Sequence, residues 1–233
     1  MRITISKENY LKAIAEAEAE GEPVIAATLA RWLNVSPPAV TMAIRRLKRD
    51  GCILVEESGH IALSDEGRKI ADRILHRHHL IERMLVEVFG MEWYKVHDEA
   101  ERLEHAVSED FEKLLLEKLG DGLVCPHGNV SELNRPDERR ERGWRTLDEA
   151  GTSALVQVMS VYERDRKLLE FLDGLRVHPG SRLEVIGQNY DDTISLLVEG
   201  KAVQLGRAVA RKVWVKEEAA ATVPAGSQAI STS

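Results

Sequence analysis

The sequence lacks most of the features that insert a chain in a membrane, cross-link it or stack bases. It has no run of about 18 apolar residues and no apolar stretch near its start, so we expect no membrane span, no Sec-type export and a cytoplasmic location. Its two cysteines, Cys52 and Cys125, are far apart and unpaired in spacing, which excludes a disulfide framework. Aromatic residues make up only 5%, which disfavours stacking on single strands. The net charge of -7 excludes a surface that is basic throughout but leaves room for a local basic patch.

The residues that are present describe a folded, highly charged protein. Hydrophobic residues make up 43% and charged residues 30% of the chain, which is typical of globular proteins. Helical periodicity dominates the first half, and short β-rich runs appear near residue 55 and after residue 151. We therefore predict a fold that is mainly α with small β parts.

The first segment, residues 1–75, is predicted to be a winged helix-turn-helix DNA-binding domain. Apolar residues recur at helical spacing in KENYLKAIAEAEAEG and in VIAATLARWLN, which ends at Asn34, a residue that tolerates the left-handed conformation. A basic third helix, PPAVTMAIRRLKRDG, follows Ser36, and two short runs around Ser58 and Gly59 predict a hairpin wing. The basic helix alone fits the solvated face of a bundle equally well. The turn and the wing in this order favour DNA binding.

Two long helices with apolar stripes follow the predicted wing. One begins after Ser64 and runs to Gly90, and the other covers roughly residues 95–119. His78 and Glu82 fall on the buried side of the first helix, where they need a partner or a metal. Residues 76–140 are therefore predicted to form a helical metal-binding and dimerisation domain.

The last third of the chain changes character. The pattern lapses after residue 121 in turn-rich and then charged sequence, and residues 141–150 are predicted to be a linker. Closely spaced strands, including RLEVIG, TISLLVEG, KAVQLG and ARKVWVK, predict a small SH3-like β-barrel at residues 151–217. Residues 218–233 have no periodicity and are predicted to be a disordered tail.

The segment HDEAERLEH carries the chemistry. Glu104 and His105 follow Glu101 at i+3 and i+4, which places two carboxylates and an imidazole on one helical face. His97, one turn earlier, can supply a second site together with the side chains of the preceding helix. Mixed oxygen and nitrogen donors suit Mn(II) or Fe(II), while other divalent transition metals would compete in vitro. On spacing alone, an exposed face stabilised by salt bridges remains an equal alternative.

Several motifs in series resemble a known family. KENYLKAI, VSPPAVTMAIRRLKRDG, RHHLIER, VHDEAERLEHAVSED and CPHGN are similar, in this order, to the metal-dependent repressors typified by the diphtheria toxin repressor. The similarity covers about residues 5–130, and the third segment resembles the SH3-like (FeoA-like) domain of longer members more weakly. The resemblance implies a homodimer that binds palindromic double-stranded operators when a divalent metal is bound, and that represses metal-uptake genes.

The resemblance also implies two sets of metal ligands. The primary set is Glu101, Glu104, His105 and Asn9, completed in some manganese sensors by the cysteine of a Cys-Pro-His-Gly segment, here Cys125. The alternative for Cys125 is a buried small residue in a turn. The ancillary set is His78, Glu82 and His97, with Glu163 from the third domain. Glu101 stands where iron-responsive members carry cysteine, which favours Mn(II), with Fe(II) as the second candidate.

The chain departs from the family pattern at two positions. Asn9 stands where manganese-type members often carry aspartate and iron-type members methionine, so it brings an amide oxygen without a charge. Lys12 stands where the small two-domain manganese regulators carry a glutamate ligand. A cation at that position disfavours a closely spaced two-metal cluster, so we expect two separated sites.

The predicted DNA-reading residues lie at both ends of the third helix. Its N-terminal part is assigned to base edges, through Ser36, Pro38, Thr41 and Met42. Its basic residues are assigned mainly to phosphates, through Arg45, Arg46, Lys48 and Arg49. Ser36 has an equal alternative role as a helix cap only.

Two other functions compete with a metal-dependent repressor. Paired Glu and His residues on helices also build di-iron carboxylate enzymes, but such enzymes need no winged helix. A winged-helix regulator that senses a small organic ligand would leave the Glu and His face structural. The sequence shows no arrangement of nucleophile, base and oxyanion donors and no glycine-rich phosphate loop, so we predict no catalysis.

Overall fold

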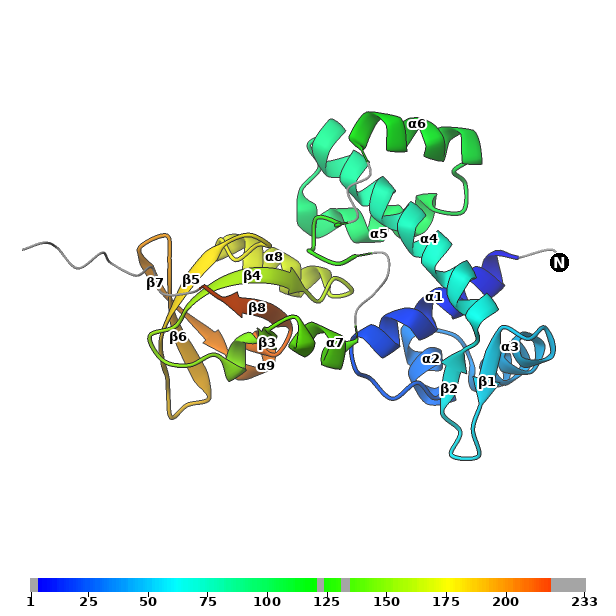
Figure 1. Cartoon of the computed structure of the whole chain (residues 1–233), viewed down its shortest axis with the longest axis horizontal. Coiled ribbons are helices and arrows are strands. Elements are labelled where there is room, and N and C mark those ends of the chain that lie inside the picture. The colour runs from blue at the N-terminus through cyan, green and yellow to red at the C-terminus, as the bar shows by residue number, and fades with distance from the viewer. Residues whose placement is uncertain (1–3, 121–123, 131–134, 219–233) are drawn as a thin grey trace, which may run out of the picture.

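The computed structural model describes residues 4–120, 124–130 and 135–218. It has three parts (Figure 1): a winged helix at the N-terminus, a group of helices around α4, α5 and α6, and a C-terminal β-domain. Of the predicted tail at 218–233, only Glu218 lies within the described residues, where its backbone N–H donates to Leu155. Within the described ranges, no helix is both long and apolar enough to cross a membrane.

The N-terminal part is a winged helix-turn-helix, which confirms the prediction. It comprises α1 (Ile5–Ala19), α2 (Ala26–Leu33), α3 (Pro37–Arg49) and the antiparallel wing strands β1 (Ile53–Val55) and β2 (Ile61–Leu63). Asn34 ends α2 in the left-handed conformation, with a φ of 51°. Leu11, Ile14 and Leu47 are among the buried residues that join the helices to the wing. The core therefore holds α3 by its apolar side and leaves the opposite side exposed.

Helix α4 (Asp65–Arg83) links the winged helix to the helical part. The Ser64 hydroxyl accepts a hydrogen bond from the backbone N–H of Gly67, and acidic residues fill the first turn, which matches the dipole of a helix N-terminus. The helix runs without a break through the predicted domain boundary at residues 75 and 76, and a π-helical turn, η1 (Met84–Val88), follows it. A movement of α4 therefore involves both parts.

The helix predicted over residues 95–119 is divided. The short turn η2 (Trp93–Lys95) leads into α5 (Val96–Leu103), and α6 (Glu109–Leu119) starts separately. The hydroxyl of Ser108 accepts from the backbone N–H of Phe111 at 3.2 Å, and acidic residues follow it, so a second helix N-terminus forms there. As a consequence, Glu104 and His105 lie beyond the end of α5.

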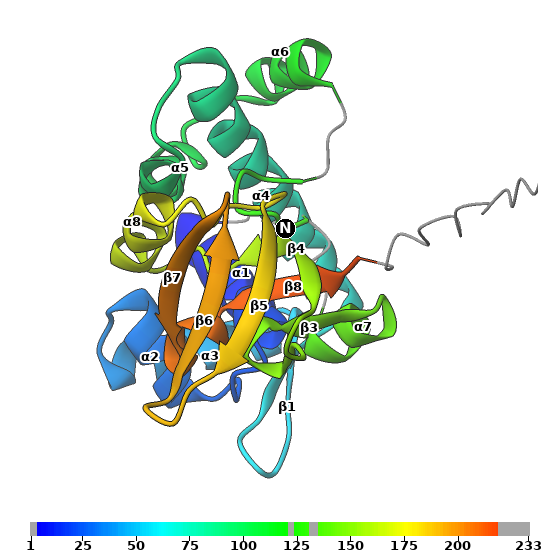
Figure 2. The same ribbon diagram turned by 90° about the vertical axis from the view of Figure 1, so that its left-hand side faces the viewer.

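The C-terminal part is a six-stranded antiparallel sheet in the order β3-β8-β4-β5-β6-β7. Its strands are β3 (Trp144–Thr146), β4 (Leu155–Val161), β5 (Arg182–Gln188), β6 (Thr193–Val198), β7 (Lys201–Gly206) and β8 (Val213–Glu217). Between them lie η3 (Leu147–Glu149), α8 (Arg166–Gly174) and α9 (Arg207–Ala210). The strands curve around a continuous apolar core (Figure 2). This arrangement confirms the predicted SH3-like fold.

The structure differs from the prediction at the linker of residues 141–150. This segment contains the end of α7 (Pro136–Glu141), β3 and η3, and Leu147 and Ala150 are buried in the core of the β-domain. The charged sequence does not reveal this order, because long charged side chains can pack by their aliphatic stems. Arg139 is only 3% exposed, and its guanidinium lies 5.0 Å from the Trp214 ring centroid.

Candidate metal centre and DNA-reading surface

Five buried side chains converge where the helical part meets the β-domain. His79 and Glu82 come from α4, Cys125 and His127 from the turn after α6, and Glu163 from the loop between β4 and α8. Potential ligand atoms of all but His127 lie within 4.8 Å of one another. Nδ1 of His127 lies 3.3 Å from a Glu82 oxygen and 3.6 Å from a Glu163 oxygen. We call these five residues the buried cluster.

The turn of residues 125–129 fits tightly against the β-domain. Gly128 has a φ of +83°, and a Cβ atom there would lie 2.0 Å from the carbonyl oxygen of Met159, so only glycine fits the position. The Asn129 side chain donates from Nδ2 to Glu163 at 2.7 Å. The turn therefore positions one cluster residue of the β-domain as well as two of its own.

A hydrogen bond outside the cluster orients the His127 ring. Its Nε2 lies 2.9 Å from the backbone carbonyl oxygen of Trp93. A carbonyl only accepts, so Nε2 carries a hydrogen, and the lone pair of the neutral ring is on Nδ1, which faces the cluster. Metal-binding histidines are commonly oriented in this way.

Burial controls the protonation of the cluster. Burial raises the pKa of the Cys125 thiol well above its ordinary value, and the nearby carboxylates raise it further. Burial also disfavours the charge of Glu82, but His127 and His78 outweigh it and lower the pKa of that carboxyl. Burial lowers the pKa of His79 to about 4. The cluster thus combines a protonated thiol, which a metal must deprotonate on binding, with a carboxylate ready to bind.

The donor set of the buried cluster fits a divalent transition metal. It offers carboxylate oxygens, imidazole nitrogens and one sulfur, and all five residues are buried. Oxygen Oε2 of Glu82 is buried and has no hydrogen-bond partner among the residues that the structure describes. A buried carboxylate oxygen without a partner is costly in an apoprotein. A bound cation would satisfy it.

The predicted ancillary residues come together next to this cluster and share two of its members. His78 Nε2 lies 3.1 Å from both Glu82 and His97. His97 Nδ1 in turn lies 3.3 Å from Glu82 and 3.9 Å from Glu163. The structure therefore brings all four predicted side chains into one neighbourhood.

Cys125 lies in a different place from its predicted one. The sequence assigned it to the primary set, but its sulfur lies 3.6 Å from Glu163 and 3.9 Å from His127. His79 and His127 are not among the predicted ligands. Two signals pointed to them: His79 and Glu82 have i, i+3 spacing, and His127 belongs to the Cys-Pro-His-Gly turn.

The predicted primary residues do not form a comparable ligand set. Within the described ranges, no group of three or more His, Cys, Asp or Glu side chains with converging ligand atoms contains Glu101, Glu104 or His105. His105 instead lies 2.9 Å from Glu8. Glu104 still continues the helical turn of Glu101, since its backbone N–H donates to the Ala100 carbonyl at 2.9 Å, whereas His105 lies beyond the helix end.

A lysine occupies the space between those residues. The ammonium of Lys12 donates to Glu104 at 2.7 Å and to Glu101 at 3.2 Å. Burial raises the pKa of Glu101, but Lys12, His97 and Arg164 outweigh burial and lower it to about 2. Asn9, the fourth predicted ligand, has a buried Oδ1 without a hydrogen-bond partner among the described residues.

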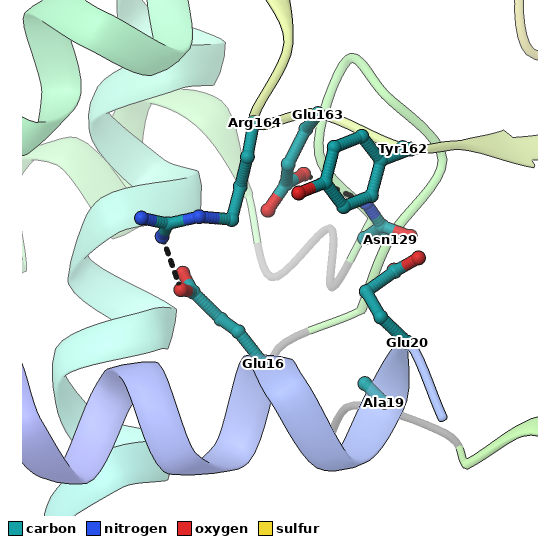
Figure 3. Close-up of a pocket in the computed structure, with 7 residues that line it drawn as sticks. All are labelled: Glu16, Ala19, Glu20, Asn129, Tyr162, Glu163 and Arg164. Atoms are coloured by element: carbon teal, nitrogen blue, oxygen red, sulfur yellow. Dashed lines mark hydrogen bonds and ion pairs between the residues drawn. The ribbon is translucent and has the colours of Figure 1, made fainter. Parts of the chain in front are cut away.

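The loop that supplies Glu163 also contacts the DNA-binding part. Figure 3 shows this junction, where Glu163 points toward Asn129 and Arg164 reaches across to Glu16 of α1. Arg164 donates to Glu16 at 2.5 Å and to the carbonyl of Trp32 at 3.3 Å, and its guanidinium lies 4.7 Å from the Trp32 ring centroid. Consecutive residues of one loop thus touch the buried cluster and helices α1 and α2.

The outer side of α3 is free to contact DNA. Every residue that the sequence assigned to DNA is exposed: Ser36, Pro38, Thr41, Met42, Arg45, Arg46, Lys48 and Arg49. Ser36 occupies the N-cap position but makes no side-chain capping hydrogen bond, so its hydroxyl is available for another partner. Basic side chains at the end of the helix suit phosphates.

Large apolar side chains remain exposed on the helical part. Their exposed fractions run from 38% to 69%, and they belong to η1, α5, α6 and the residue after η1: Val88, Phe89, Leu103, Phe111 and Leu114. Apolar surface of this kind is typical of an interface with another chain. Together with the exposed basic helix and the buried cluster, it fits the class of metal-dependent DNA-binding regulators.

Comparisons with known proteins agree with this class. The family model of the iron-dependent repressor N-terminal DNA-binding domain matches residues 2–61, and that of the iron-dependent repressor metal-binding and dimerisation domain matches 64–132. The FeoA domain model matches residues 145–217. The diphtheria toxin repressor of Corynebacterium diphtheriae is 30% identical over 219 residues, with 90% of this chain and 96% of that protein covered. The iron-dependent repressor IdeR of Mycobacterium tuberculosis is 39% identical over 122 residues, 52% of this chain and 53% of that one.

Solved structures give the same answer. A manganese-dependent transcriptional repressor in complex with manganese has a TM-score of 0.81 at 30% identity, covering 91% of this chain and 100% of that one. The apo form of the manganese-activated repressor ScaR has a TM-score of 0.76 at 27% identity, covering 90% of this chain and 100% of that one. The chain belongs to the diphtheria toxin repressor family of metal-dependent, DNA-binding transcriptional repressors.

Proposed function

We propose that the chain is a Mn(II)-activated repressor of metal-uptake genes that binds palindromic operators as a homodimer, with its activating metal in the buried cluster. The observation that carries this proposal is the position of the cluster. Its ligands come from α4, from the turn of residues 125–129 and from the β-domain. A metal held by all three would favour the arrangement in which the β-domain is docked.

The docked β-domain would act on the winged helix through Arg164. This residue follows Glu163 and binds Glu16 of α1 and Trp32 of α2. Helix α3 packs on α2, so a fixed position of α1 and α2 also fixes the DNA-reading helix. Metal binding and operator binding are then linked, because each favours the same arrangement.

The donor set supports Mn(II) and gives Fe(II) as the second candidate. Carboxylates and imidazoles suit both ions, and two of the solved structures reported above are manganese-dependent or manganese-activated repressors. Cys125 adds a softer thiol, which strengthens the case for Fe(II). When bound, the metal supplies positive charge and fixed geometry rather than a reaction. The relatives are repressors, and we propose no catalytic activity.

The dimer follows from the match to the dimerisation domain and from the exposed apolar residues of η1, α5 and α6. In a two-fold dimer each operator half-site faces one α3, and half-sites repeat roughly every 34 Å or a multiple along the duplex. Base contacts would come from Ser36, Pro38, Thr41 and Met42. Phosphate contacts would come from Arg45, Arg46, Lys48 and Arg49.

The test measures binding of promoter fragments from metal-transporter genes at one fixed salt concentration, because affinity depends on salt. The full chain is compared with chelator, with Mn(II) and with anaerobic Fe(II). We expect specific binding only with metal, at least about a thousandfold tighter than without it. Equal binding in chelator would contradict metal activation.

Matched cysteine variants test where the activating metal binds. Cys125→Ala removes the cluster thiol, whereas Cys52→Ala removes the other buried cysteine, which belongs to the core of the winged helix. We expect metal affinity to fall at least about tenfold in the first variant and to stay unchanged in the second. An equal effect in both variants would exclude the cluster as the site.

A further inference from the structure

A small polar pocket lies between α1 and α5, next to the buried cluster but separate from it. Its volume is about 150 Å³, and its polar lining consists of Asn9, Lys12, Glu16, Glu101, Glu104 and Arg164. It includes three of the residues that the sequence assigned to the primary metal site. It also contains two cations that the chain itself supplies.

The ammonium of Lys12 is held by two carboxylates. It lies 2.7 Å from Glu104 Oε2, 2.9 Å from His78 Nδ1 and 3.2 Å from Glu101 Oε1. It donates to the two carboxylates, and His78 Nδ1 lies as close to Glu104 Oε2, at 2.7 Å, as the ammonium does. Lys12 is only 3% exposed, and a buried charge persists only where it is paired in this way.

The charges of the pocket are nearly balanced without a metal. Glu16, Glu101 and Glu104 contribute three negative charges, and Lys12 and Arg164 contribute two positive ones, which leaves -1. A divalent ion added to this set would leave +1 and would place two cations against the same carboxylates. Such an arrangement is unfavourable inside a protein, where charges are poorly screened.

We propose that Lys12 is a tethered cation that takes the place of a second metal ion between α1 and α5, so that each chain holds one tightly bound metal. The pocket residues do not fit a metal while Lys12 lies among them. Lys12 belongs to α1, and the carboxylates it binds belong to α5 and the residue after it. This link between the winged helix and the helical part therefore forms without metal. Metal sensing is left to the buried cluster and the β-domain.

The proposal rests on the proposed function only in assigning the single metal to the buried cluster. Co(II) can test the role of Lys12 and the site of the activating metal separately. A thiolate bound to Co(II) gives a charge-transfer absorption that carboxylates and imidazoles do not give. That absorption reports occupancy of the Cys125 site. Equilibrium dialysis of the same samples reports total bound metal.

The experiment compares the wild-type chain with Lys12→Met, which keeps the length of the side chain and removes its charge. We expect one tight Co(II) per wild-type chain, with full charge-transfer absorption. Lys12→Met should bind a second Co(II) at least about tenfold more tightly than the wild type does, without further charge-transfer absorption. Mn(II) in dialysis should give the same stoichiometries.

Two controls sharpen this result. Lys7→Met removes another lysine of α1, paired with Asp50, and should leave the stoichiometry at one. Adding Glu101→Gln to Lys12→Met should remove the second metal again. If Lys12→Met binds no more metal than the wild type does, Lys12 does not prevent binding of a second metal and the proposal is wrong.

Two tightly bound metal ions in the wild-type chain would overturn the proposal without any variant. The test therefore does not depend on whether Lys12→Met folds. In contrast, one bound metal without charge-transfer absorption would contradict the assignment of the buried cluster. That outcome removes the proposed function's site while leaving Lys12 as the cation of the pocket.

Discussion

Arg164→Met should disconnect the DNA-binding part from the metal centre. The guanidinium binds Glu16 and the Trp32 carbonyl and lies over the Trp32 ring. Methionine keeps an unbranched stem that can still pack on the indole, but it offers neither charge nor hydrogen bonds. Glu163 keeps its own contacts with Asn129 and Cys125. The substitution therefore changes the interdomain contact and leaves the cluster intact.

The expected loss follows from the contacts that disappear. A hydrogen bond between charged groups contributes about 1.5–3 kcal/mol, and a partly desolvated cation–π contact about 0.5–2 kcal/mol. The Arg164 side chain is 18% exposed, so solvent screens it only in part. We expect the β-domain to lose about 2–4 kcal/mol of docking free energy. The coupling free energy between metal binding and operator binding cannot exceed the docking free energy. The factor by which metal increases operator affinity should therefore fall at least about tenfold.

Hydrogen exchange and operator titrations measure the two effects. Amides of α1 and α2 should exchange faster in metal-loaded Arg164→Met than in the wild type, and operator affinity in saturating metal should fall. Arg166→Met is the control, because Arg166 is half exposed and pairs only loosely with Asp98, at 3.7 Å. Unchanged exchange and unchanged operator affinity in Arg164→Met would refute this route of coupling.

Three further predictions concern the buried cluster. Gly128→Ala should weaken metal binding at least about tenfold, because its Cβ would meet the Met159 carbonyl. Gly59→Ala in the wing has a similar positive φ with open space around it, so it should leave metal affinity unchanged in the same dialysis assay. Metal affinity should rise with pH, by up to about tenfold per pH unit, because the pKa of the Cys125 thiol is raised and its proton must leave when the metal binds. Calorimetric titrations at several pH values measure this dependence. If Cys125→Ala shows the same dependence of metal affinity on pH as the wild type, the prediction is wrong. Burial lowers the pKa of His79 to about 4. Below about pH 6.5, the unfolded state therefore binds more protons than the folded state does. The free energy of unfolding of the apoprotein, measured with urea, should fall as the pH is lowered from about 6.5 toward 4.

Much of the fold follows from local sequence signals. Ser64 and its acidic successors start α4, Asn34 ends α2, and the closely spaced β-rich runs become a sheet. Such features depend on residues a few positions apart, so the sequence alone determines them. Ser108 followed by Glu109 and Asp110 is a signal of the same kind, and it explains why a single long helix was the wrong prediction for residues 95–119.

Tertiary structure decided which side chains share a site. Cys125 and Glu163 are 38 positions apart, and only the packing of the 125–129 turn against the β-domain brings them together. The two carboxylates that accept hydrogen bonds from Lys12 lie 89 and 92 positions away, so its burial among them could not be inferred from spacing. The sequence by itself therefore determined most of the elements, the family and the kinds of ligand. Only the fold decided how charges and ligands combine, because side chains distant in the chain meet only when its parts pack together.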